Sequence, residues 1–304
     1  MSFDSVELIA VGSMNVDQLT YCTRFPADGE TLVATRHAQG FGGKGANQAV
    51  MAARLGAQVS MIGCLGDDDL GDVTIANFGQ FGVDTTGIRR IAGVSSGVAP
   101  IWVDASGTNR ILIVPGANGE LTAEHVTGAL AGRHADVVVA QLETPQAATA
   151  TAFTWARASG ATTVLNSAPA APVEAAVLDQ VDWLIANESE FALLFGTEPA
   201  PDSIAAAAAA SRCGVVVTLG AAGAVVAPPG EPATSVPALS VTTVDTTGAG
   251  DAFVGAFAVA LAAGSPPVEA VGFGCAAGAL SVQRPGTQTS FPTGAEVLGA
   301  AEPR

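Results

Sequence analysis

The 304-residue chain has few cationic side chains: 12 Lys and Arg stand against 28 Asp and Glu, which gives a formal net charge of −16. A surface of this charge repels nucleic acids and anionic membranes, and no basic stripe offsets it. We therefore expect neither nucleic acid nor a membrane as a partner. Any phosphate that binds has to be held locally, by backbone N–H groups, a cation and a few placed basic side chains.

Zinc-binding and disulfide patterns are also missing. The four cysteines (Cys22, Cys64, Cys213 and Cys275) are far apart and form no C-x-x-C pair, and the three histidines form no cluster. Such cysteines are typical of reduced, mostly buried thiols in a cytosolic protein. The first five residues are acidic rather than basic, unlike a signal peptide, and polar residues interrupt every apolar stretch. We expect a soluble, cytoplasmic protein.

What the chain does have is a regular alternation of strand and helix patterns. Hydrophobic residues make up 49% of the sequence, which is enough for a large core. Helical stretches separate short apolar runs that we interpret as buried strands, at Val6–Val11, Val59–Gly63, Ala135–Ala140, Thr162–Asn166, Trp183–Ala186 and Val215–Leu219. This alternation predicts an α/β fold with a doubly wound, mostly parallel sheet covered on both faces. Ligands bind such sheets beyond the carboxyl ends of the strands.

Two segments break the alternation. Asp17–Gln39 and Gly97–Val114 show short alternating strands without helices between them. They predict a small antiparallel sheet that lies as a lid over the mouth of the main domain. The expected division is a lid of residues 14–40 and 95–114 and a main domain of residues 1–13, 41–94 and 115–304.

The most informative motif is Asp245-Thr-Thr-Gly-Ala-Gly-Asp251. Gly248 and Gly250 allow close backbone approach and conformations that other residues avoid, and the apolar run Ala252–Ala263 predicts a helix that begins here. A helix N-terminus suits a phosphate. Because a carboxylate repels phosphate, Asp251 beside it needs another purpose, and the natural one is a general base for an attacking hydroxyl. The motif thus indicates phosphoryl transfer; the alternative is a capped surface turn.

Polar residues near the N-terminus suit a polyol. Asn15 and Asp17 follow the first strand two residues apart, so in an extended segment both side chains face the same way. In the glycine-rich run Gly40–Gln48, Lys44 and Asn47 share a helix face, and the spacing is not that of a Walker A loop. Lys44 could neutralise a transferring phosphoryl group or hold a sugar oxygen. The plainer interpretations are an Asx turn and a solvated surface lysine.

Further polar residues follow later strands. Glu143 is placed for ligand hydroxyls or as a loop cap. Asn187 and Glu190 lie three apart at a helix start, which suits indirect Mg²⁺ binding or helix capping. At the next strand end, the hydroxyl of Thr218 and the backbone of Gly220 and Gly223 could contact a nucleotide.

Taken together, these motifs resemble those of the ribokinase/pfkB family of sugar kinases, over about residues 6–290. Gly42-Gly-Lys-Gly-Ala-Asn47 resembles the first family signature and Asp245-Thr-Thr-Gly-Ala-Gly-Asp251 the second. The resemblance implies a Rossmann-like α/β domain with a β-sheet lid that often serves as the interface of a homodimer. It also implies transfer of the ATP γ-phosphate to the primary (5-) hydroxyl of D-ribose.

The resemblance implies a role for each motif residue. The sugar contacts would be Asn15, Asp17, Gly43, Lys44, Asn47, Glu143 and Asp251, with Asp251 also the base and Gly248, Ala249 and Gly250 the anion hole. Asn187 and Glu190 would organise Mg²⁺–ATP, and Thr218, Gly220, Gly223, Gly250 and Cys275 would lie near the nucleotide. A monovalent cation, usually K⁺, would be held by Asp245, Thr247, Ser281, Arg284, Gly286 and Ser290, several of them through backbone carbonyls.

Three alternatives stay open at this point. The first is a kinase for another sugar or a nucleoside (2-deoxyribose, a ketohexose, an adenosine-like acceptor), although the sugar motifs contain no Tyr or Trp to stack on a base. The second is a sugar-sensing protein without catalysis, which would be expected to lose Asp251 or the anion-hole glycines. The third is a dehydrogenase, which needs a G-x-G-x-x-G after the first strand that this chain lacks.

Overall fold

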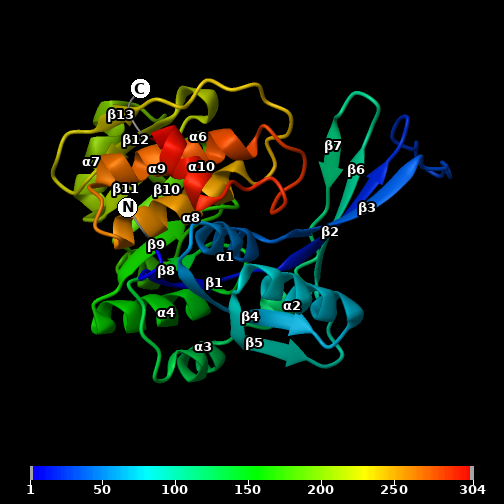
Figure 1. The fold of residues 1–304 in the computed structure, drawn as a ribbon, viewed down its shortest axis with the longest axis horizontal. Coiled ribbons are helices and arrows are strands. Elements are labelled where there is room, and N and C mark those ends of the chain that lie inside the picture. The colour runs from blue at the N-terminus through cyan, green and yellow to red at the C-terminus, as the bar shows by residue number, and fades with distance from the viewer. Residues whose placement is uncertain (1–2, 302–304) are drawn as a thin grey trace.

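The structure, a computed structural model, describes residues 3–301 and is built on one large sheet (Figure 1). The pairs from β5 through β11 are parallel, whereas β12 and β13 add antiparallel strands at one edge. The strand order is β13 (Thr234–Val236), β12 (Ala224–Ala227), β11 (Gly214–Thr218), β10 (Trp183–Asn187), β9 (Thr162–Asn166), β8 (Val137–Ala140), β1 (Glu7–Val11), β4 (Gln58–Gly66) and β5 (Asp84–Ile91). The chain leaves β1 for β4 on one side and later returns to β8 on the other, so the order reverses beside β1.

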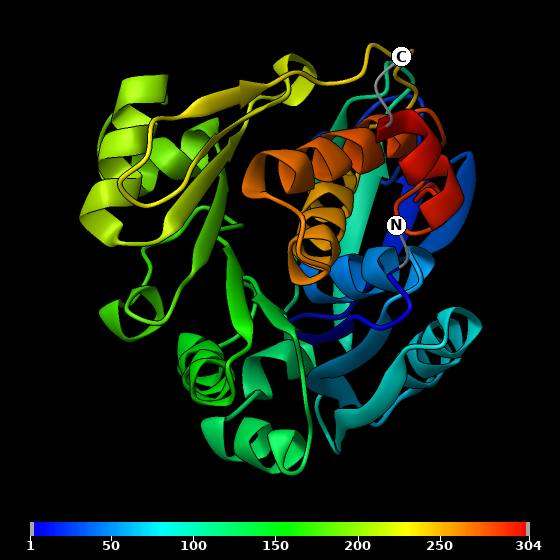
Figure 2. The same cartoon turned by 60° about the vertical axis from the view of Figure 1, so that its left-hand side comes forward.

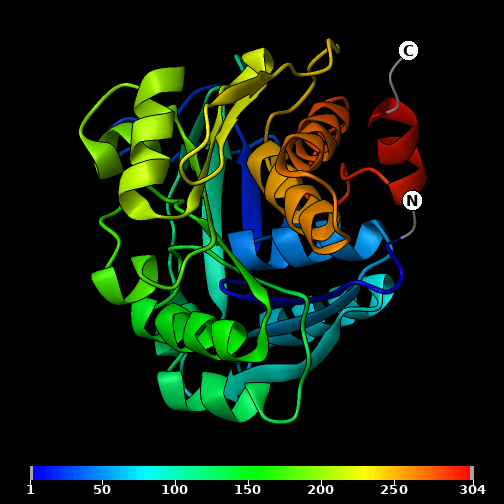
Figure 3. The same ribbon diagram turned by 90° about the vertical axis from the view of Figure 1, so that its left-hand side faces the viewer.

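The strands are apolar on both faces, and helices cover each face. In β1, Leu8 and Ala10 belong to one core cluster and Ile9 and Val11 to the other, as the period of two requires. The first cluster is covered by α1 (Lys44–Arg54), α2 (Asp69–Phe81), α8 (Ala249–Ala262), α9 (Pro267–Ser281) and α10 (Gly294–Ala301). The second is covered by α3 (Ala123–Leu130), α4 (Gln146–Ser159), α5 (Ala175–Leu178), α6 (Glu188–Phe195) and α7 (Pro201–Ser211). Figure 3 shows the two sets on opposite sides of the sheet, which confirms the predicted doubly wound, mostly parallel fold.

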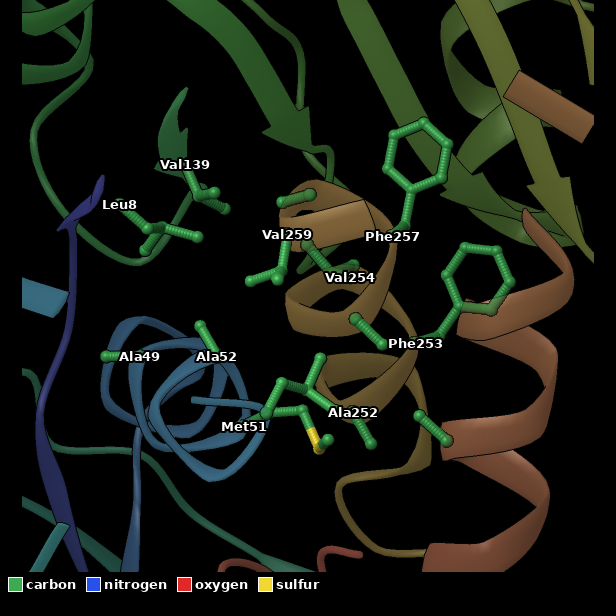
Figure 4. Packing of buried hydrophobic residues seen from close by; sticks show 14 of the residues in the cluster. Leu8, Ala49, Met51, Ala52, Val139, Ala252, Phe253, Val254, Phe257 and Val259 are labelled. Carbon is green, nitrogen blue, oxygen red and sulfur yellow. The ribbon is translucent and has the colours of Figure 1, made fainter. Parts of the chain in front are cut away.

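The central helix α8 packs directly against α1 and α9 (Figure 2). In Figure 4, Met51 and Ala52 of α1 lie beside Ala252 and Val254 of α8. The two helices cross at close range, because a β-carbon on Gly255 would lie only 2.8 Å from the carbonyl oxygen of Gln48. This contact holds the N-terminal ends of both helices at the same edge of the sheet.

A second sheet projects from the main body (Figure 1). Its order is β3 (Arg36–Gly42), β2 (Asn15–Tyr21), β6 (Gly97–Val103) and β7 (Asn109–Ile111). The expectation of an antiparallel sheet is wrong for its central pair, because β2 and β6 run parallel. Each of these two strands follows a strand of the parallel main sheet, β1 and β5, so both leave the same edge in the same direction.

The remaining expectations about the chain concern thiols and membranes. All four cysteines are buried and free, as predicted. Between residues 3 and 301, no helix has the length and apolar character needed to cross a membrane.

Candidate active site

The two glycine-rich motifs meet at the carboxyl edge of the main sheet. Asn47, in the first turn of α1, donates from Nδ2 to Oδ2 of Asp251 at 2.8 Å, across 204 residues of sequence. Gln48 Nε2 donates to Asp251 Oδ1 at 3.1 Å. Asp251 is 7% exposed and Asn47 5% exposed, so the contact is buried. The close packing of α1 on α8 thus places a polar pair at the base of the site.

The turn before α8 contains two glycines, and its conformation requires glycine at only one of them. Gly248 is the N-cap of α8, with φ 78°, and a β-carbon there would lie 2.6 Å from Thr287 Cγ2. Gly250 is different, because it lies in the first helical turn with no atom within 4 Å of a built β-carbon. The prediction that both glycines adopt conformations avoided by other residues is therefore confirmed for Gly248 and wrong for Gly250. The bare backbone of Gly250 leaves open space at a helix N-terminus instead.

Three carboxylates and one lysine share the site. Burial, together with the nearby charges of Glu143 and Asp251, raises the pKa of Asp17 to about 6. Burial likewise raises the pKa of Asp251, against the opposing effect of Lys44 and of the amide donors Asn47 and Gln48. The pKa of Lys44 is raised chiefly by Asp251, and also by Glu143 and Glu190. Lys44 is thus a fixed ammonium among acids rather than the solvated surface charge of the alternative interpretation.

Glu143 is held against the start of α1. Its Oε2 accepts from Ser13 Oγ at 2.5 Å and from the backbone N–H of Lys44 at 3.0 Å. A carboxylate at a helix N-terminus is stabilised by the helix dipole. Glu143 therefore ties the loop after β8 to the loop after β1 and to the first residue of α1.

Asn15 is oriented by a residue that the site prediction did not include. Asn118, in a short 3₁₀ helix at Gly116–Glu120, donates from Nδ2 to Asn15 Oδ1 at 2.8 Å. Its own Oδ1 accepts from Met14 N–H at 2.9 Å, so the amide cannot turn over without losing both bonds. The acceptor end of Asn15 is thereby engaged, and its donor end is the part left for a ligand.

Two adjoining pockets lie along the N-terminus of α8, and Thr218 and Gly250 line both. The larger has a volume of about 440 Å³ and is mostly apolar; among its lining residues are Thr218, Gly220, Gly223, Ala249, Gly250, Phe253 and Cys275. The smaller, of about 140 Å³, is lined by polar residues that include Lys44, Asn166, Asn187, Glu190, Gly248 and Asp251. The predicted nucleotide residues therefore share one pocket, which opens beside Asp251 and Lys44.

Asn187 and Glu190 form the capping box that was the alternative interpretation of this pair. Asn187 Oδ1 accepts from Glu190 N–H at 2.9 Å, and the Glu190 oxygens accept from Asn187 N–H at 2.9 Å and from its Nδ2 at 3.0 Å. Both side chains also line the smaller pocket, so capping does not remove them from it. No group of three or more His, Cys, Asp or Glu within residues 3–301 could hold a metal ion by itself.

Of the residues predicted to bind a monovalent cation, Thr247 and Gly286 contact Asp245. Its Oδ1 accepts from Thr247 N–H at 2.9 Å and its Oδ2 from Gly286 N–H at 3.0 Å, which joins the glycine turn to the loop after α9. The Arg284 guanidinium turns away and pairs with Glu296 of α10. Two hydroxyls of the set donate to carbonyls instead, Ser281 to Gly278 and Ser290 to Thr287.

Several site residues escaped the sequence prediction, and most are amides. Gln141 and Asn166 stand at or just after the ends of β8 and β9, so the strand-end rule could have found them. Gln48 follows Asn47 directly, inside a motif that was recognised. No sequence signal marks Gln288, whose Nε2 donates to Asn47 Oδ1 at 3.0 Å from the loop after α9.

Comparison with known proteins places this geometry in context. The family model described as pfkB family carbohydrate kinase matches residues 6–294. The ribokinase of Haemophilus influenzae is 38% identical over 297 residues, covering 96% of this chain and 97% of that protein. The deoxyribokinase of Salmonella typhi is 37% identical, covering 95% and 96%. The solved structure of Arabidopsis thaliana ribokinase complexed with ribose and ATP superimposes with a TM-score of 0.90 at 30% identity, covering 99% of this chain and 100% of that one.

Proposed function

The chain belongs to the pfkB family of carbohydrate kinases, and we propose that it transfers the γ-phosphoryl group of ATP to the 5-hydroxyl of D-ribose. The observation that carries this proposal is the hydrogen bond from Asn47 to Asp251. It joins the motif expected to bind the sugar to the motif expected to bind the phosphates. The Arabidopsis relative, solved with ribose and ATP, supports the choice of both substrates.

The sugar side of the site supplies donors and acceptors for a polyol. The ring hydroxyls form hydrogen bonds with Asn15, Asp17 and Asn47. Further sugar contacts come from Lys44, Glu143 and the backbone of Gly43. Gly43 is suited to this, because its φ of 86° and the Asn15 N atom 2.7 Å from a built β-carbon leave no room for a side chain. The 5-hydroxyl then lies near Asp251.

Asp251 acts as the general base. It takes the proton of the 5-hydroxyl as the oxygen attacks the γ-phosphorus and the bond from that phosphorus to the bridging oxygen breaks, releasing ADP. The Lys44 ammonium stabilises the charge that develops. The backbone N–H groups of Gly248, Ala249 and Gly250 at the start of α8 form the anion hole for the transferring group. Closure of the small sheet over the sugar would exclude water, which otherwise competes as the acceptor.

Two cations complete the proposal. Mg²⁺ supplies charge neutralisation to the ATP phosphates, and Asn187 and Glu190 suit contact through water, since their side chains line the smaller pocket while they cap α6. K⁺ would be held by oxygens of Asp245, Thr247, Ser281, Arg284, Gly286 and Ser290. Arg284 would contribute through its backbone, since its guanidinium pairs with Glu296. The charge of K⁺ would order the turn from Asp245 to Gly250.

We propose that the active protein is a homodimer joined through the small sheet and that it acts in the cytoplasm. Ile111, Leu112, Ile113 and Val114 are exposed at and just beyond the edge strand β7, with Trp102 on the neighbouring strand. An exposed apolar edge of this kind is typical of an interaction surface. Four free, buried cysteines support a reducing compartment.

The proposal is tested by ADP release from Mg²⁺–ATP over a panel of acceptors, each with and without K⁺. The panel contains D-ribose, 2-deoxyribose, fructose, other ketoses and nucleosides. Strong turnover on ribose that rises with K⁺ supports the substrate and the cation site together. Turnover on 2-deoxyribose alone, the candidate favoured by the Salmonella relative, keeps the kinase and changes the acceptor. Intact sugar binding without turnover on any acceptor indicates a sensing protein.

A further inference from the structure

Three buried side-chain amides form a chain of hydrogen bonds that ends on Asp251. Asn77 Nδ2 donates to Gln288 Oε1 at 2.8 Å, and Gln288 Nε2 donates to Asn47 Oδ1 at 3.0 Å. Asn47 Nδ2 completes the chain at Asp251 Oδ2, at 2.8 Å. None of the four residues is more than 7% exposed. The chain links α2 and the loop after α9 to the polar pair formed by α1 and α8.

The direction of the chain is dictated from its Asp251 end. An ionised carboxylate only accepts hydrogen bonds, so Asn47 has to present its Nδ2 group to Asp251. The Asn47 Oδ1 atom then faces Gln288, which has to donate, and the Gln288 Oε1 atom in turn needs the donor of Asn77. Turning one amide over would bring two acceptors or two donors together in a buried place and would break two hydrogen bonds.

A second chain reaches the other oxygen of the same carboxylate. Gln141 Nε2 donates to Gln48 Oε1 at 2.6 Å, and Gln48 Nε2 donates to Asp251 Oδ1 at 3.1 Å. The second hydrogen of Gln48 Nε2 is directed to Asn166 Oδ1, also at 3.1 Å, and the bond to Asp251 Oδ1 is the longer of the two on Asp251. The shorter bond is the one to Oδ2, at the end of the Asn77–Gln288–Asn47 chain.

We propose that Gln288 and Asn77 are positioning residues for the Asn47–Asp251 pair, because they fix which way the Asn47 amide faces. Neither residue lines either pocket, so they act through Asn47 rather than on a ligand. The role of Asp251 as a base rests on the proposed function. The orientation of Asn47 does not, since it is set by hydrogen bonds to Asp251 and Gln288.

The charges around Asp251 define what this orientation changes. Lys44, from α1, favours the ionised carboxylate, whereas burial and the charges of Glu143 and Asp17 oppose ionisation. Glu190 faces Lys44 from α6. Burial is the largest of these effects and raises the pKa; a donor on Oδ2 opposes it and favours the ionised carboxylate, and an acceptor in its place would do the reverse.

Two nearly isosteric substitutions reverse the direction of these hydrogen bonds, each at a different residue. In Gln288→Glu the new carboxylate cannot donate, so Asn47 turns its Nδ2 group toward position 288 and its Oδ1 toward Asp251. In Asn77→Asp, Gln288 turns its Nε2 group toward position 77, with the same consequence for Asn47. Gln288→Met keeps the size of the side chain without polar atoms or charge, so a shift in that variant reports lost orientation rather than an added charge. Thr74→Val is the matched control on α2, because the Thr74 hydroxyl bonds to the Leu70 carbonyl within the helix and stands outside the chain.

The experiment follows the pKa of the Asp251 carboxyl in the ligand-free protein by ¹³C NMR of labelled aspartate, with Asp251→Asn identifying the signal. We expect an upward shift of about one unit in Gln288→Glu and Asn77→Asp, a smaller one in Gln288→Met and none in Thr74→Val. With ribose and Mg²⁺–ATP, the acid limb of kcat/KM should move by the same amount. If the Asp251 pKa in every folded variant equals that of the wild type, the proposal is overturned. The same holds if the variants lose thermal stability without any shift of that pKa. A wild-type protein that turns over no sugar defeats the proposed function, while the titration still decides this inference.

Discussion

The Asp17 carboxylate occupies the space that Gly42 leaves by having no side chain. A β-carbon built on Gly42 would lie 2.5 Å from Asp17 Oδ1 and 2.7 Å from Oδ2. In the register of β2 and β3, Asn15 lies opposite Gly42 and Asp17 opposite Gly40, so the carboxylate lies beside the end of β3, two residues before α1 begins at Lys44. The missing side chain of Gly42 on β3 thus makes room for Asp17 on β2, a residue proposed to contact the sugar.

Gly42→Ala is therefore expected to displace Asp17 and to weaken ribose binding roughly 10- to 100-fold, the range for an ångström-scale misplacement. Gly40→Ala on the same strand is the control, because its β-carbon would meet Asp17 Cβ and Leu19 Cδ1 at an ordinary 3.8 Å. Isothermal titration with ribose compares the two variants. Wild-type affinity in Gly42→Ala would remove Asp17 from the set of sugar ligands.

The raised pKa of Asp17 predicts an unusual dependence of stability on pH. Burial, followed by Glu143 and Asp251, raises this pKa from 3.8 to about 6 in the folded protein. Between these values the folded chain holds a proton that the unfolded chain has lost, so the contribution of Asp17 is fully present below about pH 4 and is lost as the pH rises through about 6. Asp17→Asn should raise the free energy of unfolding above pH 6, on the order of 1–3 kcal/mol. Urea denaturation should show that gain at pH 8 and little of it near pH 4, whereas an equal gain at both pH values contradicts the assignment.

Sequence patterns predicted the six inner parallel strands of the main sheet and missed β5, β12 and β13. The run Thr162–Asn166 has the same bounds as β9, a strand in which every residue after the first is buried. By contrast, β5 and β13 lie at the two edges of the sheet and are largely solvent-accessible, so their sequences carry no apolar run. The helix expected from Ala252 begins at Ala249, because the glycine motif itself forms the first turn.

The site was predictable where the chemistry is local in sequence. The neighbourhood of Asp251, Lys44 and Asn47 follows from two compact motifs and from the rule that ligands bind at strand ends. Of the amides behind them, Gln141 follows a strand end and Gln48 lies inside a recognised motif, so both were within reach of the sequence. Gln288 was not, because no local pattern marks it and it comes from a loop far away in the sequence. The arrangement of these amides depends on how closely α1 packs on α8, which no local pattern reports.

Asp251→Asn separates binding from chemistry. The amide keeps the shape of the side chain but cannot accept the proton, so kcat should fall roughly 10²–10⁴-fold while ribose binds with little change. Asp202→Asn is the control, since Asp202 also lies in the first turn of a helix, α7, but is exposed and remote from the pockets. Steady-state kinetics and ribose titration decide the outcome. Near-normal turnover in Asp251→Asn would exclude Asp251 as the base.

The two glycines of the anion hole are expected to fail in different ways. Gly248→Ala forces a side chain onto a φ of 78° and to within 2.6 Å of Thr287, so it should destabilise the protein by about 1–3 kcal/mol. Gly250→Ala meets no protein atom within 4 Å, so its free energy of unfolding should be unchanged. Its β-carbon would stand where the phosphate approaches the backbone, however, and kcat should fall about tenfold or more. Denaturation and kinetics on both variants test this split, and a Gly250→Ala protein with full activity would place the phosphate elsewhere.

The exposed edge of the small sheet makes the oligomeric state testable. Leu112 is 67% exposed beside Ile111 and Ile113, and in a dimer formed through this edge it would be covered. A buried, unpaired carboxylate is costly, so Leu112→Asp should dissociate the dimer into monomers without weakening the fold of each chain. Val268→Asp is the control, because Val268 is also exposed and apolar but lies at the start of α9, where a carboxylate favours the helix dipole. Light scattering after size exclusion measures both variants: a wild-type monomer, or a dimer that survives Leu112→Asp, would contradict assembly through this edge.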